Sequence, residues 1–405
     1  MNIEQIRSDT PLHKQYTYLN SAAASAPPQS VVDTMVNYLQ KTASVGPYLP
    51  AFRRETYLQI EEIRGKVAGF IGANRTEIAW AKNGTEAIHF VAGGIPWKPG
   101  NEVILTDIEF HSNYVPWMKL QAEEKIRLKV VKTGPNGMIS VNKIANMITS
   151  RTRLITISHL SNASGALQPI KEICQVAKKH NALTLINASQ TLGLVPLNVR
   201  EIDCDFLAAC GRKWLRGPEG SGMLYIRESL IESITPTIIG WGGTTWDFQT
   251  DAYSFLPTAG RVEAGSPNVP SILGLGAAID YAEQIGISAI YSRVKELTSY
   301  CVEKLRTIPG ISIYGPDNTE DRLAIIPFNV SGLNPERITD FLEDHRIIIE
   351  AGTFMANKML QKYGIDKMAR ISPHYFNTTE EIDRTVDLIA LLLRQEGAKT
   401  VNPSA

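Results

Sequence analysis

Two apolar runs, Leu154-Ile155-Thr156-Ile157-Ser158 and Leu183-Thr184-Leu185-Ile186-Asn187, flank the amphipathic segment Ile170–His180. The flanking runs are short and apolar, as buried strands are, whereas the segment between them has the pattern of a surface helix. A strand, a helix and a second strand in this order form a βαβ unit, which joins parallel strands. The sequence therefore predicts a parallel sheet with helices packed on it.

The same alternation extends from about Glu77 to Arg227. The runs with strand character are Glu77–Ala81, Glu102–Leu105, Leu128–Val131, Leu154–Ser158, Leu183–Asn187, Phe206–Ala209 and Gly222–Ile226. These runs predict a mainly parallel, seven-stranded sheet that helices cover on both faces.

After about Ser271 the pattern changes to longer helical segments. The expected elements are helices at Ile272–Gln284, Ala289–Arg306 and Glu380–Gln395 and one short apolar run at Ala324–Val330. We therefore expect a large α/β domain at residues 15–270 and a smaller α+β domain at residues 1–14 and 271–405. The stretch Gly240–Gly260 is rich in Gly, Thr and aromatic residues without a clear period, which predicts a long, functional loop.

The composition is that of a folded protein without net charge. Of the 405 residues 43% are hydrophobic and 20% charged, and 41 Lys and Arg balance 41 Asp and Glu, so nothing draws the chain to nucleic acid or to an anionic membrane. The four Cys form no CxxC pair, which argues against disulfides and a metal site and favours a reducing cytoplasm. Neither Met1–Thr10 nor Leu388–Leu393 has the apolar length of a signal peptide or a membrane anchor.

Lys213 lies in the segment Ala209-Cys210-Gly211-Arg212-Lys213-Trp214, between an apolar strand and a Gly-rich turn. A lysine held at a strand end among apolar residues and beside Arg212 has a lowered pKa, which makes the amine a good Schiff-base nucleophile. The segment by itself is also compatible with a surface lysine in a basic turn.

Three other segments also follow predicted strands. Lys82-Asn83-Gly84-Thr85-Glu86-Ala87 opens a helix, where backbone N–H groups and the Thr85 hydroxyl can bind a phosphate, although an ordinary capped helix has the same pattern. Ser158-His159-Leu160-Ser161-Asn162 and Asn187-Ala188-Ser189-Gln190 end two further strands. Because ligands of open α/β sheets bind outside the carboxyl ends of strands, these segments and Lys213 predict one shared pocket.

Eight segments, in this order and spacing, resemble the class V aminotransferase family of fold-type I pyridoxal-phosphate enzymes over nearly the whole chain. They are Tyr18–Ala23, Asn83–Ile88, Glu109–Asn113, Ser158–Asn162, Ala188–Gln190, Gly211–Trp214, Glu263–Asn268 and Arg370–Thr378. The resemblance implies a fold-type I architecture, an amino-acid substrate, and pyridoxal 5'-phosphate held as a Schiff base by Lys213. It is strongest to the branch that contains cysteine desulfurases, isopenicillin N epimerases and the C–S lyases of ergothioneine synthesis.

The resemblance also implies a role for individual residues. The implied cofactor contacts are Gly84, Thr85, Phe110, Asn162, Asn187, Gln190, Arg212, Lys213 and Ser266. Gly84, Thr85 and Arg212 would surround the phosphate together with Ser266 from a second copy of the chain, so that a homodimer shares its active sites. Arg370, with Asn20, would bind the substrate carboxylate as a bidentate pair. A surface ion pair of Arg370 with Glu380 or Glu381 is the alternative.

Two positions beside the cofactor depart from the family. Asn187 stands where members usually have an Asp whose charge keeps the ring nitrogen of the cofactor protonated, so the electron sink should be weaker here. Drift in a weakened enzyme is the alternative explanation. Phe110 stands where the desulfurases have a stacking His, and Phe can stack but cannot carry a proton. The neighbouring His111 is either catalytic or structural.

The third departure concerns cysteine. The desulfurases carry a nucleophilic Cys on a mobile loop before the C-terminal Arg motif, but the corresponding stretch Glu350–Asn357 has none. Persulfide transfer is therefore not expected. Cys210, beside Lys213, either contacts the phosphate or is a small buried apolar residue.

These features favour an enzyme that acts at the α-carbon of an amino acid, with Lys213 taking the α-proton. With Asn187 weakening the electron sink, a C–S lyase that works by β-elimination, or an epimerase, in specialised metabolism is favoured over transamination. The alternatives are an ordinary class V aminotransferase and a non-catalytic protein that binds pyridoxal phosphate. The substrate side chain and the role of His374 stay open.

Overall fold

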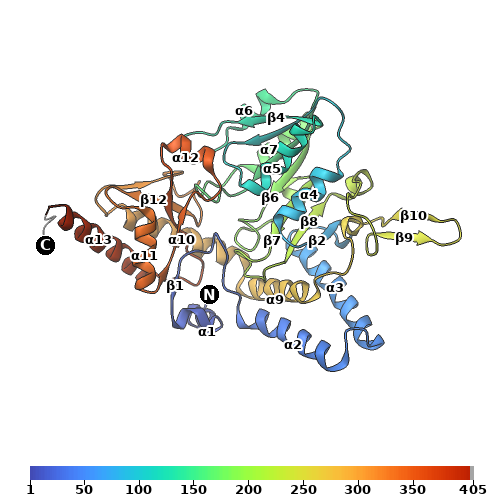
Figure 1. The fold of residues 1–405 in the computed structure, drawn as a ribbon, viewed down its shortest axis with the longest axis horizontal. Coiled ribbons are helices and arrows are strands. Elements are labelled where there is room, and N and C mark those ends of the chain that lie inside the picture. The colour runs from blue at the N-terminus through green and yellow to red at the C-terminus, as the bar shows by residue number, and fades with distance from the viewer. Residues whose placement is uncertain (402–405) are drawn as a thin grey trace.

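The computed structural model describes residues 1–401, with side chains up to residue 396. Its largest sheet has seven strands in the order β2-β8-β7-β6-β5-β3-β4 (Figure 1). These are β2 (Ile78–Ala81), β3 (Asn101–Thr106), β4 (Ile126–Val131), β5 (Thr152–Ser158), β6 (Leu183–Asn187), β7 (Phe206–Cys210) and β8 (Gly222–Ile226). β8 runs antiparallel to both of its neighbours, and the other pairings are parallel. The predicted α/β fold with a mainly parallel seven-stranded sheet is confirmed.

Both faces of this sheet are buried, because its strands are apolar on both sides. Leu154 and Leu185 belong to the hydrophobic core on one face, whereas Ile155 and Ile186 belong to the core on the other. Successive side chains of a strand point to opposite faces, so an uninterrupted apolar run needs cover on both sides. The helices that follow these strands are α4 (Gly84–Gly94), α5 (Val115–Ala122), α6 (Val141–Met147), α7 (Ile170–Lys179) and α8 (Val199–Ile202).

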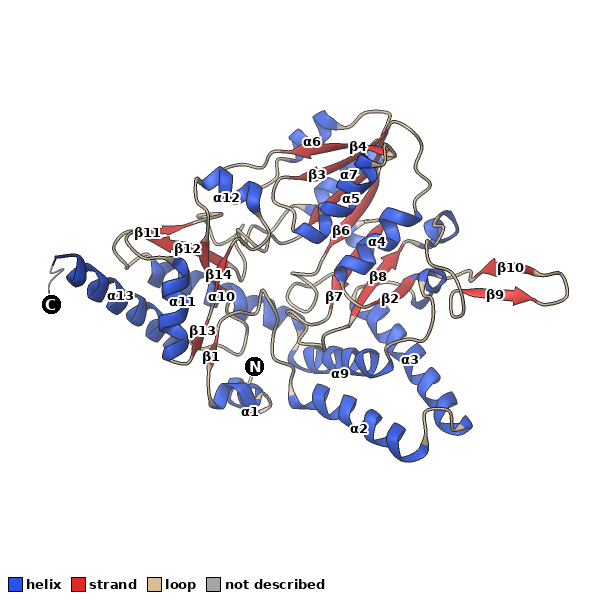
Figure 2. Cartoon of the chain, in the orientation of Figure 1, coloured by secondary structure: helices blue, strands red, loops and turns tan. Residues whose placement is uncertain are grey.

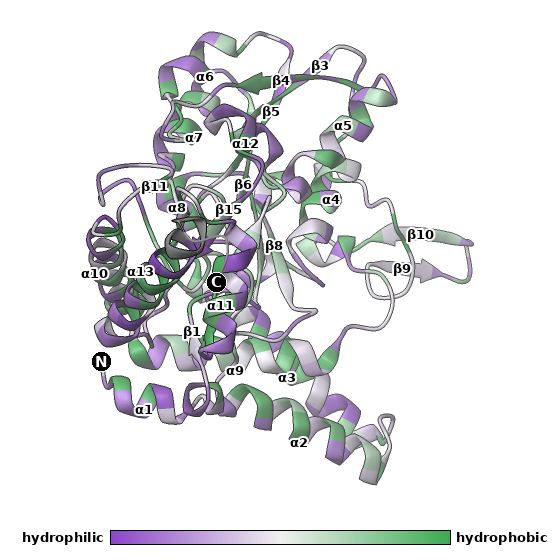
Figure 3. Cartoon of the chain, turned by 60° about the vertical axis from the view of Figure 1, so that its left-hand side comes forward, coloured by the Kyte–Doolittle hydropathy of each residue, from purple (hydrophilic) through white to green (hydrophobic). Residues whose placement is uncertain are grey.

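The helix α7 shows how the sequence sets this packing. Its buried residues are Ile170, Ile173, Cys174 and Ala177, which form one stripe at helical spacing. The opposite side is charged and exposed. Figure 3 shows the same division on other outer helices, which carry both hydrophobic and hydrophilic stretches.

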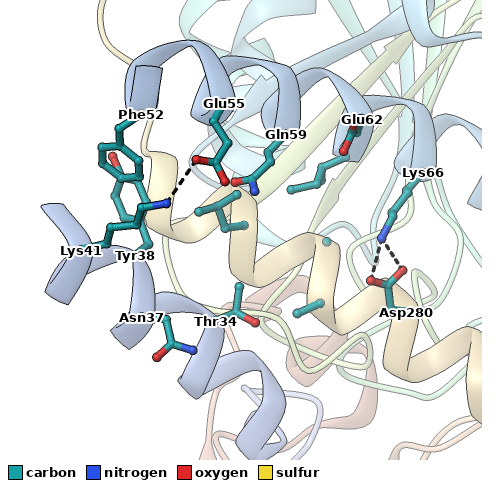
Figure 4. A pocket seen from close by; sticks show the side chains of 14 residues that line it. Thr34, Asn37, Tyr38, Lys41, Phe52, Glu55, Gln59, Glu62, Lys66 and Asp280 are labelled. Carbon is teal, nitrogen blue, oxygen red and sulfur yellow. Dashed lines mark hydrogen bonds and ion pairs between the residues drawn. The ribbon is translucent and has the colours of Figure 1, made fainter. Parts of the chain in front are cut away.

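Three helices lie together below the sheet in Figure 1, namely α2 (Gln29–Val45), α3 (Pro50–Phe70) and α9 (Val269–Ile285). A Cβ atom on Gly276 of α9 would lie 2.8 Å from Cγ1 of Ile63, so this glycine lets α3 and α9 approach closely. Figure 4 shows the cleft between the three helices, where ion pairs join Lys41 to Glu55 at 3.1 Å and Lys66 to Asp280 at 2.6 Å. The charged groups of these pairs already have partners.

The C-terminal part is built on a four-stranded antiparallel sheet in the order β11-β12-β15-β14. Its strands are β11 (Ile311–Ile313), β12 (Ile326–Val330), β14 (Glu350–Gly352) and β15 (Met368–Ile371). Its helices are α10 (Ile287–Leu305), α11 (Pro335–Asp344), α12 (Asn357–Tyr363) and α13 (Thr379–Val401). The N-terminus contributes α1 (Ile3–Ser8) and β1 (Thr17–Tyr18), which pairs with β13 (Ile347–Ile348). The domain boundaries at residues 14 and 270 stay predictions.

The interpretation of Gly240–Gly260 as a loop without secondary structure is wrong. Two strands, β9 (Thr244–Asp247) and β10 (Ala252–Phe255), form an antiparallel hairpin that projects from the body of the molecule (Figure 2). Trp246 and Tyr253 lie opposite each other in it, and both are exposed. Because neither face of the hairpin is buried within the chain, its sequence lacks the alternation of apolar and polar residues that marks a half-buried strand.

No helix within residues 1–401 combines the length and the apolarity that crossing a lipid bilayer requires.

Candidate active site

The carboxyl ends of β2, β5, β6 and β7 surround one cavity, as the sequence predicted. The cavity is lined by Asn83, Gly84, Thr85, Ile88, Phe110, Ser112, Ser158, Leu160, Asn162, Asn187, Ser189, Gln190, Cys210, Arg212 and Lys213. All the predicted cofactor contacts except Ser266 are among them. Their convergence follows from the parallel sheet, because strands that point the same way end at the same edge.

The helix α4 begins at this cavity. The Asn83 side chain caps it by accepting the Glu86 N–H at 2.9 Å, which leaves the N–H groups of Gly84 and Thr85 without an acceptor inside the helix. A Cβ atom on Gly84 would lie 2.5 Å from Oγ of Ser189, so only glycine leaves this corner open. Free N–H groups at the positive end of a helix, beside hydroxyl groups, form a binding site for an anion.

Lys213 reaches the cavity from the loop after β7. Its Nζ lies 5.6 Å from the centre of the Phe110 ring. Within residues 1–396 no carboxylate forms an ion pair with it, and burial lowers its pKa to about 8, with help from the charges of Arg212 and Arg370. A lowered pKa leaves more of the amine neutral near pH 7, the form that can attack a carbonyl group or accept a proton.

Trp214 fixes the loop that carries Lys213 through two hydrogen bonds. Its indole N–H donates to Gln190 Oε1 at 2.7 Å, and its carbonyl oxygen accepts from His374 Nε2 at 3.0 Å. His374 is fully buried and its Nδ1 accepts the N–H of Tyr375, so both ring nitrogens are used by a neutral imidazole. Burial holds the pKa of His374 well below its usual value. His374 therefore supports the loop and does not enter the cavity.

Asn187 is tied to a buried carboxylate that sequence reasoning missed. Its Oδ1 accepts the Ser189 N–H at 3.1 Å, and its Nδ2 donates to Ser158 Oγ at 3.2 Å. Ser158 donates its hydroxyl proton to Glu109 at 2.5 Å. Glu109 is 4% exposed and also accepts hydrogen bonds from Thr106 and Asn113, and burial raises its pKa. These two contacts use the Oδ1 of Asn187 and one N–H of its Nδ2, which leaves the second N–H of this cavity-lining residue for a ligand.

Arg370 lies at the end of β15 and is 3% exposed. Its guanidinium donates to Asn162 O at 3.1 Å and to Asn20 Oδ1 at 3.2 Å, and it forms an ion pair with Glu350. The Phe354 ring lies 4.1 Å from it. Arg370 Nε is buried without a partner within residues 1–396, so a donor remains for an incoming carboxylate.

The structure thus brings Arg370 and Asn20 together, as predicted, and also places the backbone of Asn162 beside them. The alternative, a surface ion pair of Arg370 with Glu380 or Glu381, is wrong, because Arg370 is buried and Glu381 pairs with Arg7 at 2.9 Å.

A model of the aminotransferase class-V family matches residues 17–385. The chain belongs to this family. A probable cysteine desulfurase of Methanothermobacter thermautotrophicus is 35% identical over 387 residues, which are 94% of this chain and 96% of that protein. The solved apo structure of a cysteine desulfurase from Thermococcus onnurineus has a TM-score of 0.92 at 32% identity and covers 97% of this chain and 98% of its own. A mutant of the protein C-DES, with glycine covalently linked to its PLP cofactor, shares the fold at 23% identity and a TM-score of 0.87, covering 95% and 98%.

As a member of this family the chain is an enzyme that uses pyridoxal phosphate, and its cavity fits that cofactor. The open corner at Gly84 and the N–H groups of α4 suit the phosphate, and Lys213 offers an amine of lowered pKa beside an aromatic ring. The side chain of Gln190 is engaged at both ends, because its Nε2 donates to Ala22 O at 3.0 Å and its Oε1 accepts from Trp214. Gln190 can therefore contact the cofactor only while its side chain keeps these two hydrogen bonds.

Ser266 and His111 lie outside the lining of this cavity, as do Arg370 and Asn20. Ser266 is exposed and lines a separate, open cavity with Trp241 and Tyr57. His111 is exposed, whereas its neighbours Phe110 and Ser112 line the Lys213 cavity. All four Cys are free and buried, and Cys210, which is 5% exposed, is the one that lines the cavity.

Proposed function

We propose that this enzyme is a C–S lyase that removes a sulfur-containing group from the β-carbon of an amino acid. Its relatives named above include cysteine desulfurases, which act on a C–S bond by name. The observation that carries the proposal is that Lys213, an amine of lowered pKa, and the buried Arg370 lie at the same site. None of those relatives is named an epimerase, which favours the lyase over the epimerase.

The chain supplies three functions to this reaction. The bound cofactor supplies an electron sink that makes the Cα–H bond of an amino acid acidic. Lys213, which holds the cofactor covalently at rest, takes the Cα proton on its Nζ once that nitrogen is free. The electrons of the Cα–H bond then expel the sulfur from Cβ, and hydrolysis of the remaining fragment gives pyruvate and ammonia.

Binding is divided between two ends of the site. We assign the phosphate to the N–H groups of Gly84 and Thr85 and to Arg212, whose own Nη1 donates to Ala23 O at 2.9 Å. The substrate carboxylate accepts from the unpartnered Nε–H of Arg370, beside Asn20. Asn187 would hold the ring nitrogen of the cofactor through an N–H and would supply no charge to it.

The segment before β15 supports release of the sulfur into solution. In place of a thiol, the stretch from Glu350 to Asn357 presents Phe354, whose ring packs on Arg370 and whose carbonyl accepts from Asn162 at 2.9 Å. Cys210 is buried at the phosphate end and donates weakly to Ser189 O. A thiol that is bound in this way is poorly placed to take a persulfide from the substrate, so the leaving group departs as a free thiol.

We expect purified enzyme, supplied with S-substituted cysteines, to form thiol and pyruvate in equal amounts. The measurement is a paired assay of both products, with pyridoxamine phosphate and the D-isomer determined in the same samples. A keto acid that keeps its sulfur, together with pyridoxamine phosphate, would identify an aminotransferase instead. Formation of D-amino acid would identify an epimerase, and no turnover of any amino acid would leave only a binding protein.

The same assay on Asn187→Asp tests the role of this residue. A carboxylate within hydrogen-bond reach of the ring nitrogen raises its pKa by about 1–3 units and strengthens the electron sink. We expect a larger share of pyridoxamine phosphate per turnover than in the wild type. An unchanged partition would mean that Asn187 does not act on the ring.

We also propose a homodimer in which Ser266 completes the phosphate site of the other subunit. Ser266 lies outside the Lys213 cavity of its own chain, in an open cavity of about 820 Å³. Two exposed aromatic residues line the same cavity, Trp241 at 54% and Tyr57 at 37% exposure. Such residues are enriched where proteins associate.

A cytoplasmic location stays a prediction.

Mixing two variants tests this shared site. Ser266→Asp places a negative charge against the phosphate, and Lys213→Ala removes the amine. If Ser266 acts across the dimer, chains mixed during refolding or co-expression should regain activity and cofactor absorbance that neither variant has alone. In that mixed dimer one site has both Lys213 and an intact serine from its neighbour. No recovery in verified heterodimers would place Ser266 in its own subunit's site.

A further inference from the structure

Arg370 has a carboxylate directly beside it in this chain. Glu350 on β14 is the antiparallel partner of Arg370 on β15, and directly opposite residues of such a pair present their side chains on the same face of the sheet. Their side chains form an ion pair. The charge of Glu350 also raises the pKa of Lys213 slightly, against the larger effect of burial. Glu350 therefore belongs to the same site as Lys213 and Arg370.

The two members of this ion pair differ in exposure. The Arg370 side chain is 3% exposed, whereas the Glu350 side chain is 40% exposed. The guanidinium is held by Asn162 and Asn20 as well as by Glu350, so it does not depend on Glu350 alone for its position. Within residues 1–396 Glu350 bonds Arg370 through Oε2 alone, so Oε1 of this 40% exposed side chain has no hydrogen-bond partner.

Substrate binding changes the charge balance around Glu350. Under the proposed function the substrate brings a carboxylate to Arg370, so that one guanidinium then faces two carboxylates. The negative charges of Glu350 and the substrate repel each other at short range in a half-buried site. A substrate with a positive charge on its side chain restores the balance by pairing with Glu350, whereas a neutral or anionic side chain leaves it unfavourable.

We propose that Glu350 determines specificity by binding a cationic group, an ammonium or a guanidinium, on the side chain of the substrate. The substrate class is then an amino acid with a sulfur at the β-carbon and a positive charge beyond the sulfur. This inference rests on the proposed function, because it takes Arg370 as the carboxylate site. Glu350 acts beside the reacting atoms and is not needed for the proton transfer at Lys213.

Two isosteric probes separate this role from a structural one. S-(2-aminoethyl)cysteine and S-propylcysteine differ only at the end of the side chain, where the first carries an ammonium group and the second a methyl group. The dissociation constant of each is measured with the holoenzyme by calorimetry under conditions of slow turnover, and kcat/KM is measured alongside. We expect the wild type to favour the aminoethyl probe by about tenfold, as is typical of a close charge pair, and Glu350→Gln to favour neither.

Glu343→Gln removes an exposed carboxylate of α11 that does not line the Lys213 cavity, and it should leave the preference unchanged. If Glu350 only holds Arg370 in place, Glu350→Gln will weaken the binding of both probes by the same factor, which would contradict the proposal. Equal affinity of the wild type for the two probes would contradict it as well. If neither probe binds the wild type, the assignment of Arg370 as the carboxylate site fails, and this inference fails with it.

Discussion

Lys213→Ala should abolish the covalent link between chain and cofactor and reduce activity by more than 10²–10⁴-fold, roughly the loss expected from proton transfer alone. The variant should still fold, because Lys213 borders the cavity and belongs to none of the hydrophobic clusters of the large sheet. The measurements are the absorbance of the bound cofactor, the mass of the chain after borohydride reduction, and the circular dichroism spectrum. Borohydride should leave the cofactor attached to the wild type and not to the variant.

Lys179→Ala is the matched control for this variant. Lys179 is an exposed lysine at the end of α7, remote from the strand ends that form the cavity. Its removal should change neither the absorbance nor the activity. If the Lys213→Ala chain still carries the cofactor covalently after reduction, another amine holds it and the assignment of Lys213 is wrong.

Arg370→Ala should lower kcat/KM by roughly 30-fold to several thousand-fold, which corresponds to about 2–5 kcal/mol for truncation of one partner of a buried charge pair. The change removes the donor at Nε that is free for the substrate carboxylate and leaves Glu350 without its partner. The cofactor should be retained, because Arg370 is not among the residues that line the phosphate end. Steady-state kinetics and a titration of apoenzyme with pyridoxal phosphate measure the two effects separately.

Arg370→Lys distinguishes charge from geometry in this variant series. Lysine keeps the positive charge but offers no planar pair of N–H donors, so it should recover only part of the loss. A variant of Arg370 that releases the cofactor while its KM stays unchanged would assign the guanidinium to the cofactor and not to the substrate.

Much of the large sheet could be predicted, because its strands are apolar on both faces and are separated by turns and helices. The runs at Leu183–Asn187 and Gly222–Ile226 match β6 and β8 residue for residue. The cavity followed from the same pattern, since residues just after parallel strands meet at one edge. Helices α2 and α3 were not predicted, and the hairpin of β9 and β10 was missed because it buries neither face within the chain.

The side-chain network of the site could not be predicted from the sequence. Glu109 is one carboxylate among 41 acidic residues, and nothing local shows that its partners are Ser158, 49 residues away, and Thr106. The pairing of Glu350 with Arg370 depends on the register of β14 and β15, which the sequence does not reveal. The motif around Arg370 was visible, but the acid opposite it was not.

The contact between Asn20 and Arg370 also sets an order of events during synthesis. These residues are 350 positions apart, and Ser21 is joined to Ser372 by a backbone hydrogen bond of 3.2 Å. The ribosome releases the chain from its N-terminus, so the strand ends from Gly84 to Lys213 emerge long before Arg370 does. The nascent chain can therefore bring together its own residues around the cofactor phosphate while Arg370, which binds the substrate, is still untranslated. Only the finished polypeptide, with its first and last segments joined, has both halves.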